Sequence, residues 1–322
     1  MKFGILQFFS WPERRFPLPS VYARALQRIE IMDRSGYDAV WLTEHHFNDY
    51  SVCPSIPVMG AYAAARTQRL RIGTGVTLAA FYHPLRLAEE IALLDILSGG
   101  RVNWGAGRGF DPKEFQTFGV PLEQSQARFR EAVDVVLQAW TNERITYHGE
   151  CFSFNDVEVL PKPLQKPHPP MWVACGSMDA LQWAASKGYS PLVGPHSTCR
   201  DMGLHWEFYR DRLEAHGYSM AGRDVPMARL LAIAPSDAEA AEIAREGAKW
   251  LLKTYVNRDI LGAHGDPVQH YIDSVVIHGT PERVIGQIAR LREEIHLDYL
   301  IGAPLSHGTF ISFTDEVLPK FL

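Results

Sequence analysis

Residues 36–47 read Gly-Tyr-Asp-Ala-Val-Trp-Leu-Thr-Glu-His-His-Phe, an apolar run that ends in acidic and imidazole side chains. The central part, Ala39–Thr43, is short and apolar on both faces, so it predicts a buried parallel strand. Before it, Val21, Ala25 and Ile29 repeat at helical spacing and predict a helix. A helix followed by a buried strand is typical of α/β proteins.

The same alternation continues in both directions from this stretch. Apolar runs bounded by Gly or Pro predict eight strands, at Lys2–Phe9, Ala39–Thr43, Leu70–Leu78, Arg101–Ala106, Pro170–Cys175, Ser190–Val193, Ala228–Ala234 and Asp298–Gly302. Helical spacing appears between them, for example at Leu87–Leu97 and Arg128–Trp140, and Thr280-Pro281-Glu282 has the form of a helix start. We therefore expect a single domain over residues 1–322, an α/β TIM barrel of eight strand–helix units with insertions.

Two longer irregular stretches interrupt this pattern, Glu143–Pro169 and Tyr255–Asp273. In the first, the sequence Tyr-His-Gly-Glu at 147–150 favours a small hairpin. The second mixes glycine and proline with charged residues. Long loops inside a compact domain are usually functional or mobile.

Composition excludes several classes of protein. Of the 322 residues, 46% are hydrophobic and 21% charged, and the net charge of -5 argues against nucleic acid as a partner. The four cysteines form no metal-like or disulfide pattern, so we expect reduced thiols and a cytoplasmic location. Lys2–Phe9 is expected to be a strand and not a signal peptide, and no apolar stretch is long enough to cross a membrane.

The active site of such a barrel lies at the carboxyl ends of its strands. The triplet Glu44-His45-His46 follows the predicted strand Ala39–Thr43, so it is a candidate for catalytic or metal-binding residues. Neighbouring residues of a strand point to opposite faces, so His45 and His46 are not expected to share a metal ion, and we predict no metal site. His45 is the better candidate for a catalytic proton donor or acceptor. The alternative is a hydrogen-bonded structural imidazole, which is the favoured interpretation for His46.

A phosphate site is the second candidate. The stretch 105–109, Gly-Ala-Gly-Arg-Gly, is a weak dinucleotide signal, since no acidic residue follows on a second strand. Arg108 can grip phosphate oxygens in two places, and Gly176-Ser177 opens a helix whose N–H groups suit an anion. The alternative for Arg108 is a salt bridge at the barrel rim. Six further residues are expected to line an apolar pocket: Phe8, Trp11, Phe47, Phe81, Phe110 and His196.

Several of these segments together resemble the bacterial luciferase-like flavin-dependent monooxygenases. The matching segments are 36–47, Ile72–Val76, His83–Arg86 with the helix to Leu97, Ser98–Arg101, Gly105–Gly109, Phe115–Val120 and Gly279–Glu282. They cover nearly the whole chain, and it is their joint occurrence that is specific.

The resemblance implies an enzyme that receives reduced FMN from a separate flavin reductase and oxygenates a small organic substrate through a flavin C4a-hydroperoxide. It implies that His45 is catalytic, that Arg108 and Ser177 hold the FMN phosphate with Gly176 beside them, and that the flavin packs on a cis peptide bond between Gly75 and Val76. It also implies that Tyr255–Asp273 is a mobile active-site loop and that the chain forms a homodimer or higher homo-oligomer.

The sequence departs from luciferase at three positions. Gly107 stands where luciferase has a reactive cysteine, Gly176 replaces an acidic residue and Ala180 replaces a threonine, which argues against light emission. Two other functions share the barrel: a deazaflavin (F420)-dependent oxidoreductase and a flavin-binding protein without turnover. The sequence from Thr43 to Phe47 favours the FMN monooxygenase, and the substrate is not readable.

Overall fold

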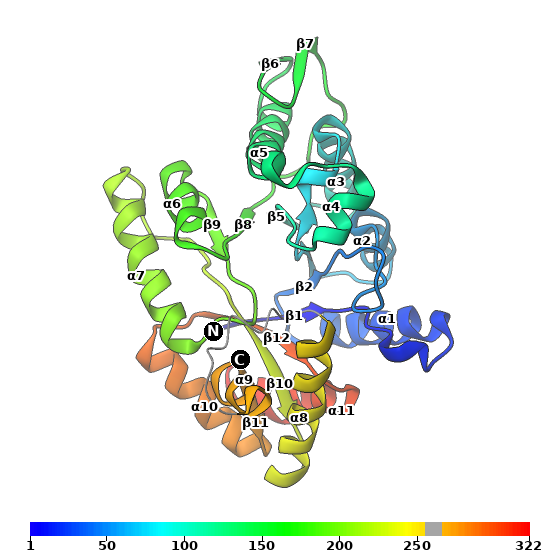
Figure 1. Cartoon of the computed structure of the whole chain (residues 1–322), viewed down its shortest axis with the longest axis vertical. Helices are drawn as coiled ribbons and strands as arrows, with labels where there is room; N and C mark the ends of the chain where they lie inside the picture. Colours follow the sequence, from blue (N-terminus) through cyan, green and yellow to red (C-terminus); the bar gives the residue numbers. More distant parts are fainter. Residues whose placement is uncertain (255–265) are drawn as a thin grey trace. The chain divides into compact units, whose positions relative to one another are not determined.

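A computed structural model describes residues 1–254 and 266–322, and strands and helices alternate along this part of the chain (Figure 1). Each of the eight predicted strands is present. They are β1 (Lys2–Gln7), β2 (Ala39–Leu42), β3 (Arg71–Thr74) continued by β4 (Thr77–Leu78), β5 (Val102–Gly107), β8 (Met171–Ala174), β9 (Ser190–Leu192), β10 (Met227–Ile233) and β12 (Tyr299–Pro304).

Helices are present where helical spacing was noted, around Val21–Ile29, Leu87–Leu97 and Arg128–Trp140. The α-helices of the described residues are α1 (Leu18–Ser35), α2 (Ile56–Ala65), α3 (Pro84–Leu97), α4 (Pro112–Phe118), α5 (Ser125–Thr141), α6 (Met178–Lys187), α7 (Cys199–Ala215), α8 (Asp237–Thr254), α9 (Pro267–Val275), α10 (Pro281–Glu294) and α11 (His307–Ser312). The predicted start of α10 is confirmed, because the Thr280 side chain accepts a hydrogen bond from the N–H of Arg283 at 3.4 Å.

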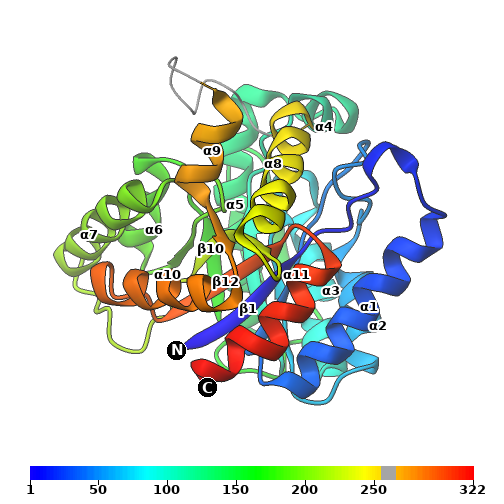
Figure 2. The same ribbon diagram turned by 90° about the horizontal axis from the view of Figure 1, so that it is seen from below.

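The chain forms two compact units, each made of segments from different parts of the sequence. The first comprises Met1–Leu6, Arg34–Asp38 and Cys175–Leu322. Within it β12 pairs in parallel with both β1 and β10, and these three strands lie side by side in Figure 2. Every residue of β10 is buried, as expected for a parallel strand covered on both faces.

The second unit comprises Gln7–Asp33 and Ala39–Ala174. Its strands β2, β3, β5 and β8 pair in parallel in that order, and β4 also pairs with β5. The prediction that residues 1–322 form a single domain stays a prediction. The parallel pairing inside each unit confirms the α/β fold class.

Glycines on neighbouring strands make room for tryptophans in the core of the second unit. Trp41 is fully buried, and a Cβ atom on Gly73 would lie only 2.6 Å from its ring. The Trp41 ring meets the edge of Trp172 at 5.2 Å between ring centres. Gly105 is held as closely, because its N–H donates to the Thr74 hydroxyl at 2.7 Å. These strands therefore approach each other more closely than residues with side chains allow.

The hairpin expected around 147–150 is confirmed. β6 (Ile145–His148) and β7 (Ser153–Val157) pair antiparallel, and the Glu131 carboxylate accepts the N–H groups of residues 150, 151 and 152 at its turn. Beyond the hairpin the chain runs irregularly to β8, with cis bonds before Pro161 and Pro167.

The second irregular stretch was predicted to be one loop over Tyr255–Asp273, and this is wrong for its last part. Residues 255–265 lie outside the described residues. Asp266 caps α9 by accepting the N–H of Val268 at 2.9 Å, and Pro267 occupies the first turn. Asp followed by Pro is a helix start, so a helix begins where the sequence analysis extended the loop. β11 (Val276–Gly279), which pairs with β10, was also not predicted.

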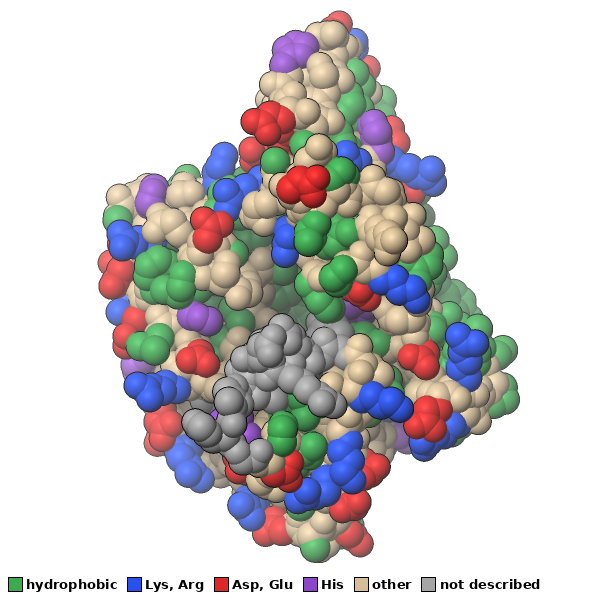
Figure 3. All heavy atoms as spheres, viewed as in Figure 1, with side chains coloured by type: hydrophobic (Ala, Val, Ile, Leu, Met, Phe, Trp, Pro, Cys, Tyr) green, Lys and Arg blue, Asp and Glu red, His purple; other side chains and the backbone are tan. Residues whose placement is uncertain are grey.

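The surface carries charge of both signs. On the face drawn in Figure 3, acidic and basic side chains are interspersed. In the part of the chain that the structure describes, no helix combines the length and apolar composition needed to cross a bilayer.

Substitution of Gly105 tests the close packing of β3 and β5. A Cβ atom at this position would lie 2.1 Å from the carbonyl oxygen of Thr74, a backbone atom that cannot rotate away. We expect Gly105→Ala to lower the free energy of unfolding by roughly 1–3 kcal/mol, measured by denaturant unfolding.

Gly286→Ala is the matched control, because Gly286 lies in α10 with no other atom within 4 Å of the added Cβ. This substitution should leave stability unchanged or raise it by up to about 1 kcal/mol. Equal stability of the two variants would contradict the packing described here.

Candidate functional site

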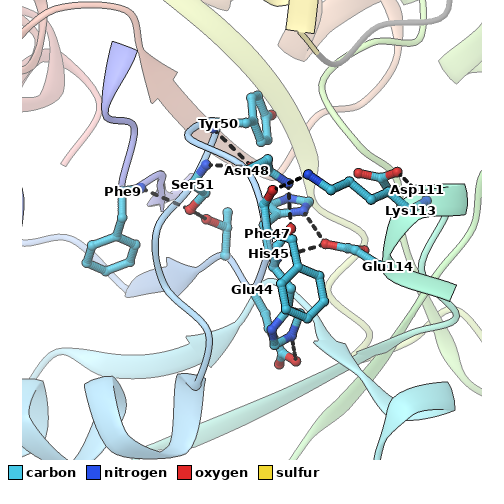
Figure 4. Close-up of polar contacts among 12 residues, drawn as sticks. Phe9, Glu44, His45, Phe47, Asn48, Tyr50, Ser51, Asp111, Lys113 and Glu114 are labelled. Carbon is cyan, nitrogen blue, oxygen red and sulfur yellow. Dashed lines mark hydrogen bonds and ion pairs between the residues drawn. The ribbon is translucent and has the colours of Figure 1, made fainter. Parts of the chain in front are cut away.

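The end of β2 runs into a loop that holds itself in shape (Figure 4). The side chain of Asn48 donates to the carbonyl of His46 at 2.9 Å and accepts the N–H of Tyr50 at 3.0 Å. Ser51 lies 3.0 Å from the hydroxyl of Thr43 and accepts the N–H of Phe9 at 3.2 Å. The histidines therefore sit on a fixed turn and not on a loose loop.

His45 is enclosed by a carboxylate and two aromatic rings. Its Nδ1 lies 3.6 Å from Oε1 of Glu114, and its side chain is 10% exposed. The rings of Tyr50 and Phe110 meet the imidazole edge-on, with ring centres at 5.0 and 6.0 Å. An imidazole held in this way is suited to accept or donate a proton.

His46 has a different carboxylate and a different environment. Its Nε2 lies 3.1 Å from Oε1 of Glu44, whose other oxygen accepts the hydroxyl of Tyr82 at 3.1 Å. Burial raises the pKa of Glu44 and, with that carboxylate beside it, the pKa of Tyr82. The His46 ring packs edge-on against Phe118 at 4.8 Å. This is the structural imidazole that the sequence analysis favoured at position 46.

The two histidines thus use separate carboxylates. They lie beyond the end of β2 at Leu42, so the alternation of side chains along a strand, on which the prediction rested, does not apply to them. In residues 1–254 and 266–322 no three His, Cys, Asp or Glu side chains are grouped so that they can hold a metal ion.

Glu114 is the site residue that sequence reasoning missed. It lies in α4, is 0% exposed, and accepts the backbone N–H of His46 at 2.8 Å. The neighbouring Lys113 donates to the carbonyl of Phe47 at 2.7 Å. A sequence signal for Glu114 did exist. Asp111-Pro112 has the form of a helix start, and it places Glu114 in the first turn of a helix shortly after the 105–109 stretch.

Arg108 follows β5 and retains donors for a ligand. One of its terminal nitrogens donates to the hydroxyl of the buried Ser125 at 3.0 Å, and its guanidinium lies 5.9 Å from the centre of the Phe115 ring. The rim salt bridge, the alternative considered for this residue, is not formed with any residue that the structure describes. A half-buried arginine without a carboxylate partner fits a phosphate or carboxylate group.

Gly176 and Ser177 lie in the other unit, at the start of α6. The Ser177 hydroxyl accepts the N–H of Ala180 at 3.2 Å as the cap of this helix. A Cβ atom on Gly176 would meet nothing within 4 Å, so the backbone there is open. The prediction that Arg108 and Ser177 hold one phosphate stays a prediction.

The peptide bond between Gly75 and Val76 is cis, as the resemblance implied. The Val76 side chain lies directly against Gly107, because a Cβ atom there would be 2.4 Å from Cγ2 of Val76. Position 107 therefore has no room for a cysteine unless Val76 moves. Cys53 and Cys175 are buried, and burial raises the pKa of each thiol to about 12. His45, the surface beside Val76 and the Arg108 guanidinium all belong to the second unit, and they are the kinds of groups that a flat, phosphorylated cofactor requires.

The expected pocket residues fall into groups. Phe110 contacts His45 and Phe8 contacts Tyr50, with ring centres 5.2 Å apart in the second pair. Phe47 and Phe81 both pack on Phe118, on the side of His46. The indole of Trp11 donates to the carbonyl of Phe16 at 2.7 Å, and the backbone N–H of Trp11 donates to the carbonyl of Asp49 at 2.9 Å.

His196 lies in the other unit, with Tyr271 and Arg229. Its Nδ1 is hydrogen-bonded to the Tyr271 hydroxyl. Burial, with a smaller contribution from the charge of Arg229, lowers the pKa of His196 to about 4. At neutral pH this imidazole is uncharged.

The sequence model of one family, described as luciferase-like monooxygenase, matches residues 1–298. The chain belongs to this family. Over 177 residues it is 32% identical to the oxygenase component of a flavin-dependent trigonelline monooxygenase of Acinetobacter baylyi, a match to 54% of this chain and 49% of that protein. The chain spans about half the length of the curated relatives with which it shares most identity.

Solved structures extend the similarity to the whole chain. The monooxygenase RslO1 from Streptomyces bottropensis matches with a TM-score of 0.84 and 27% identity, covering 100% of both chains. The coenzyme F420-dependent tetrahydromethanopterin reductase of Methanopyrus kandleri matches with a TM-score of 0.81 at 21% identity, over 100% of this chain and 99% of that one. The second likeness concerns the fold alone. The predicted luciferase-like α/β barrel fold is confirmed.

Acid stability tests the buried position of His196. Its pKa is about 4 in the folded protein and about 6.5 in the unfolded chain, so the unfolded state binds the extra proton between these values. Stability is therefore fully present above about pH 6.5 and falls as the pH drops toward 4. Between pH 7 and pH 4 the free energy of unfolding should fall less in His196→Gln than in the wild type, by on the order of 2–3 kcal/mol. Urea unfolding across this pH range measures the difference.

The matched control is His216→Gln, at the exposed end of α7. Its stability should follow the wild-type pH curve. If His196→Gln followed the same curve as this control, His196 would not be a buried neutral imidazole.

Proposed function

We propose that the chain is the oxygenase of a two-component FMN-dependent monooxygenase. It takes reduced FMN from a separate flavin reductase and uses O2 to oxygenate a small apolar organic molecule. The observation that carries this proposal is His45, fixed at the carboxyl end of β2 between Glu114, Tyr50 and Phe110. Membership of the luciferase-like monooxygenase family supports it.

The cofactor residues have distinct tasks in this proposal. Arg108 supplies a cation and forked donors to the FMN phosphate, and Ser177 and Gly176 supply the start of a helix. Gly75, Val76 and Gly107 supply a surface without polar side chains for the flat ring. Reduced FMN, when bound, supplies the electrons that activate O2.

His45 moves the proton. Its imidazole accepts a proton from the substrate or returns one, and the Glu114 carboxylate, 3.6 Å from Nδ1, favours the protonated ring. The aromatic rings at the same strand ends exclude water and favour an apolar substrate, with Phe110 beside the imidazole and Phe8 behind Tyr50. We extend this proposed pocket to Trp11, Phe47 and Phe81, which belong to the same unit; the expected place of His196 in it stays a prediction.

Two alternatives use the same fold. An F420-dependent oxidoreductase transfers hydride without oxygen, and the fold of the Methanopyrus enzyme is compatible with it. A flavin-binding protein without turnover has no need of a fixed imidazole. The enclosed His45 favours the monooxygenase over the second alternative. We also propose that the protein forms a homodimer or higher homo-oligomer and that it is located in the cytoplasm.

Incorporation of 18O from labelled O2 tests the reaction. The assay contains FMN, NADPH, a flavin reductase and one of two probe substrates, a medium-chain aldehyde or a cyclic ketone. We expect mass spectrometry to find one labelled oxygen atom in the product, and His45→Ala to reduce its rate about 100-fold or more because the positioned proton carrier is lost.

His148→Gln, a substitution in the exposed hairpin, is the control and should leave the rate unchanged. Reduction or oxidation of F420 without O2, with no labelled product, would overturn the monooxygenase in favour of the hydride-transfer enzyme. Undiminished labelling by His45→Ala would overturn the role of His45.

The phosphate role of Arg108 is tested by comparing FMN with riboflavin. Loss of a hydrogen bond between charged groups costs about 1.5–3 kcal/mol, so Arg108→Ala should weaken FMN binding about 10–100-fold. Riboflavin, which has no phosphate, should bind the variant and the wild type equally. Quenching of flavin fluorescence measures both affinities.

Arg86→Ala is the control, because Arg86 is exposed on α3 and pairs only with Glu90 among its described ion-pair partners. It should bind FMN as the wild type does. An equal loss of FMN and riboflavin affinity in Arg108→Ala would point to a structural role for the arginine.

A further inference from the structure

We infer that Glu44 and Tyr82 are positioning residues. Their hydrogen bond holds the turn that carries His45 in a fixed orientation to the segment 75–82, which contributes the flavin surface in the proposed function. The importance of this bond for catalysis rests on the proposed function. The bond itself does not, because both residues belong to the second unit of the chain.

The first argument is the set of contacts made by the Glu44 carboxylate, whose side chain is 0% exposed. One of its oxygens lies 3.1 Å from Nε2 of His46, and the other accepts the hydroxyl of Tyr82 at 3.1 Å. A buried carboxylate is costly unless hydrogen-bond donors replace the water around it. Both oxygens therefore depend on these partners, which come from two different segments of the chain.

The second argument is that this bond adds a point of attachment between the two segments. Their backbones are joined just beyond the ends of β2 and β3, where the N–H of Gly75 donates to the carbonyl of Leu42 at 2.7 Å. A single point of attachment lets two segments rotate about it. The bond between Glu44 and Tyr82 lies further along both segments, and the two points together fix their relative orientation.

The third argument is that the segment 75–82 is itself fixed to β5. The Thr77 hydroxyl donates to the carbonyl of Gly105 at 3.1 Å. Residues 79–81 then form a short 3-10 helix, which is closed by the N–H of Tyr82 donating to the carbonyl of Ala79 at 3.4 Å. Tyr82 therefore ends a fixed segment and not a loose loop.

The fourth argument concerns the turn on the other side of the bond. Glu44 is directly followed by His45, whose backbone N–H donates to the carbonyl of Cys53 at 3.2 Å. The next backbone N–H, that of His46, donates to the Glu114 carboxylate at 2.8 Å. The turn therefore moves as a body, and a displacement of Glu44 displaces His45 with it. Catalytic groups tolerate little displacement, since about 1 Å can cost 100-fold in rate.

Tyr22 provides a matched control for Tyr82. Its hydroxyl donates to the carbonyl of Val52 at 2.6 Å, in the same loop that carries the histidines. Tyr22 lies in α1, so this bond joins the loop to a helix and not to the segment 75–82. Tyr→Phe at either position removes one hydroxyl and keeps the ring. Only the change at position 82 should loosen the loop and the segment 75–82 together.

The test is hydrogen–deuterium exchange of the flavin-free protein, followed by mass spectrometry of its peptides. We expect Tyr82→Phe to speed exchange about 10-fold or more in the peptides covering residues 43–53 and 75–83, because a buried carboxylate oxygen loses its donor. Tyr22→Phe should affect the first of these peptides and leave the second unchanged. In the wild type, the two peptides should open together, with the same dependence on low concentrations of urea.

A second measurement connects the bond to catalysis. In the 18O assay, Tyr82→Phe should lower kcat about 10-fold or more, because His45 is no longer held at a fixed distance from the flavin surface. A merely structural bond would lower the stability of the variant and leave kcat of the folded enzyme unchanged, as we expect for Tyr22→Phe.

The outcomes separate this inference from the proposed function. Exchange that rises in residues 75–83 but not in 43–53 overturns the positioning role, and so does independent opening of the two peptides in the wild type, which needs no variant to fold. Either result in an enzyme that inserts labelled oxygen leaves the proposed function intact. Joint loosening in a protein that inserts no labelled oxygen supports the positioning role and overturns the monooxygenase.

Discussion

The end of β2 is organised by the need to solvate two carboxylates that have no access to water. Glu44 and Glu114 are both buried, and an ionised carboxylate in such a place costs several kcal/mol unless donors replace its water. The donors come from the ring and backbone of His46 and from Tyr82. Each carboxylate lies beside a different imidazole, Glu114 beside His45 and Glu44 beside His46. These separate contacts fix the orientation of the two histidine rings.

Close strand packing provides the second half of the site. Gly73 and Gly105 let the strands approach until Trp41 and the Thr74 carbonyl fill the space of a side chain, and Val76 does the same at Gly107. The surface at the strand ends is therefore formed by backbone and one small apolar side chain. Chemical groups reach this surface from the loops, through His45 and Arg108. A rigid interior and functional loops are the usual division of labour in this class of fold.

Much of this arrangement was predictable from local sequence. The strands are apolar runs bounded by Gly or Pro. The separation of His45 from His46 was expected for the wrong reason, because both lie in the turn beyond β2 and not in the strand. Glu114 was not predictable in the same way, because an acid in the first turn of a helix usually faces water and the helix dipole. Only folding brings it to His46, 68 positions away. The start of α9 at Asp266-Pro267 was hidden by the glycines that precede it, and the glycine surface depends on contacts between strands.

The thiols of this protein have a consequence for its survival in air. Any protein that handles reduced flavin is exposed to hydrogen peroxide, and peroxide attacks the thiolate form of cysteine. Cys53 and Cys175 are buried with a pKa raised to about 12, so they remain protonated at neutral pH. Position 107, next to Val76, holds no sulfur and has no space for one. These two buried thiols therefore offer peroxide neither an accessible sulfur nor a thiolate, and the core around them is shielded from the by-product of the proposed reaction.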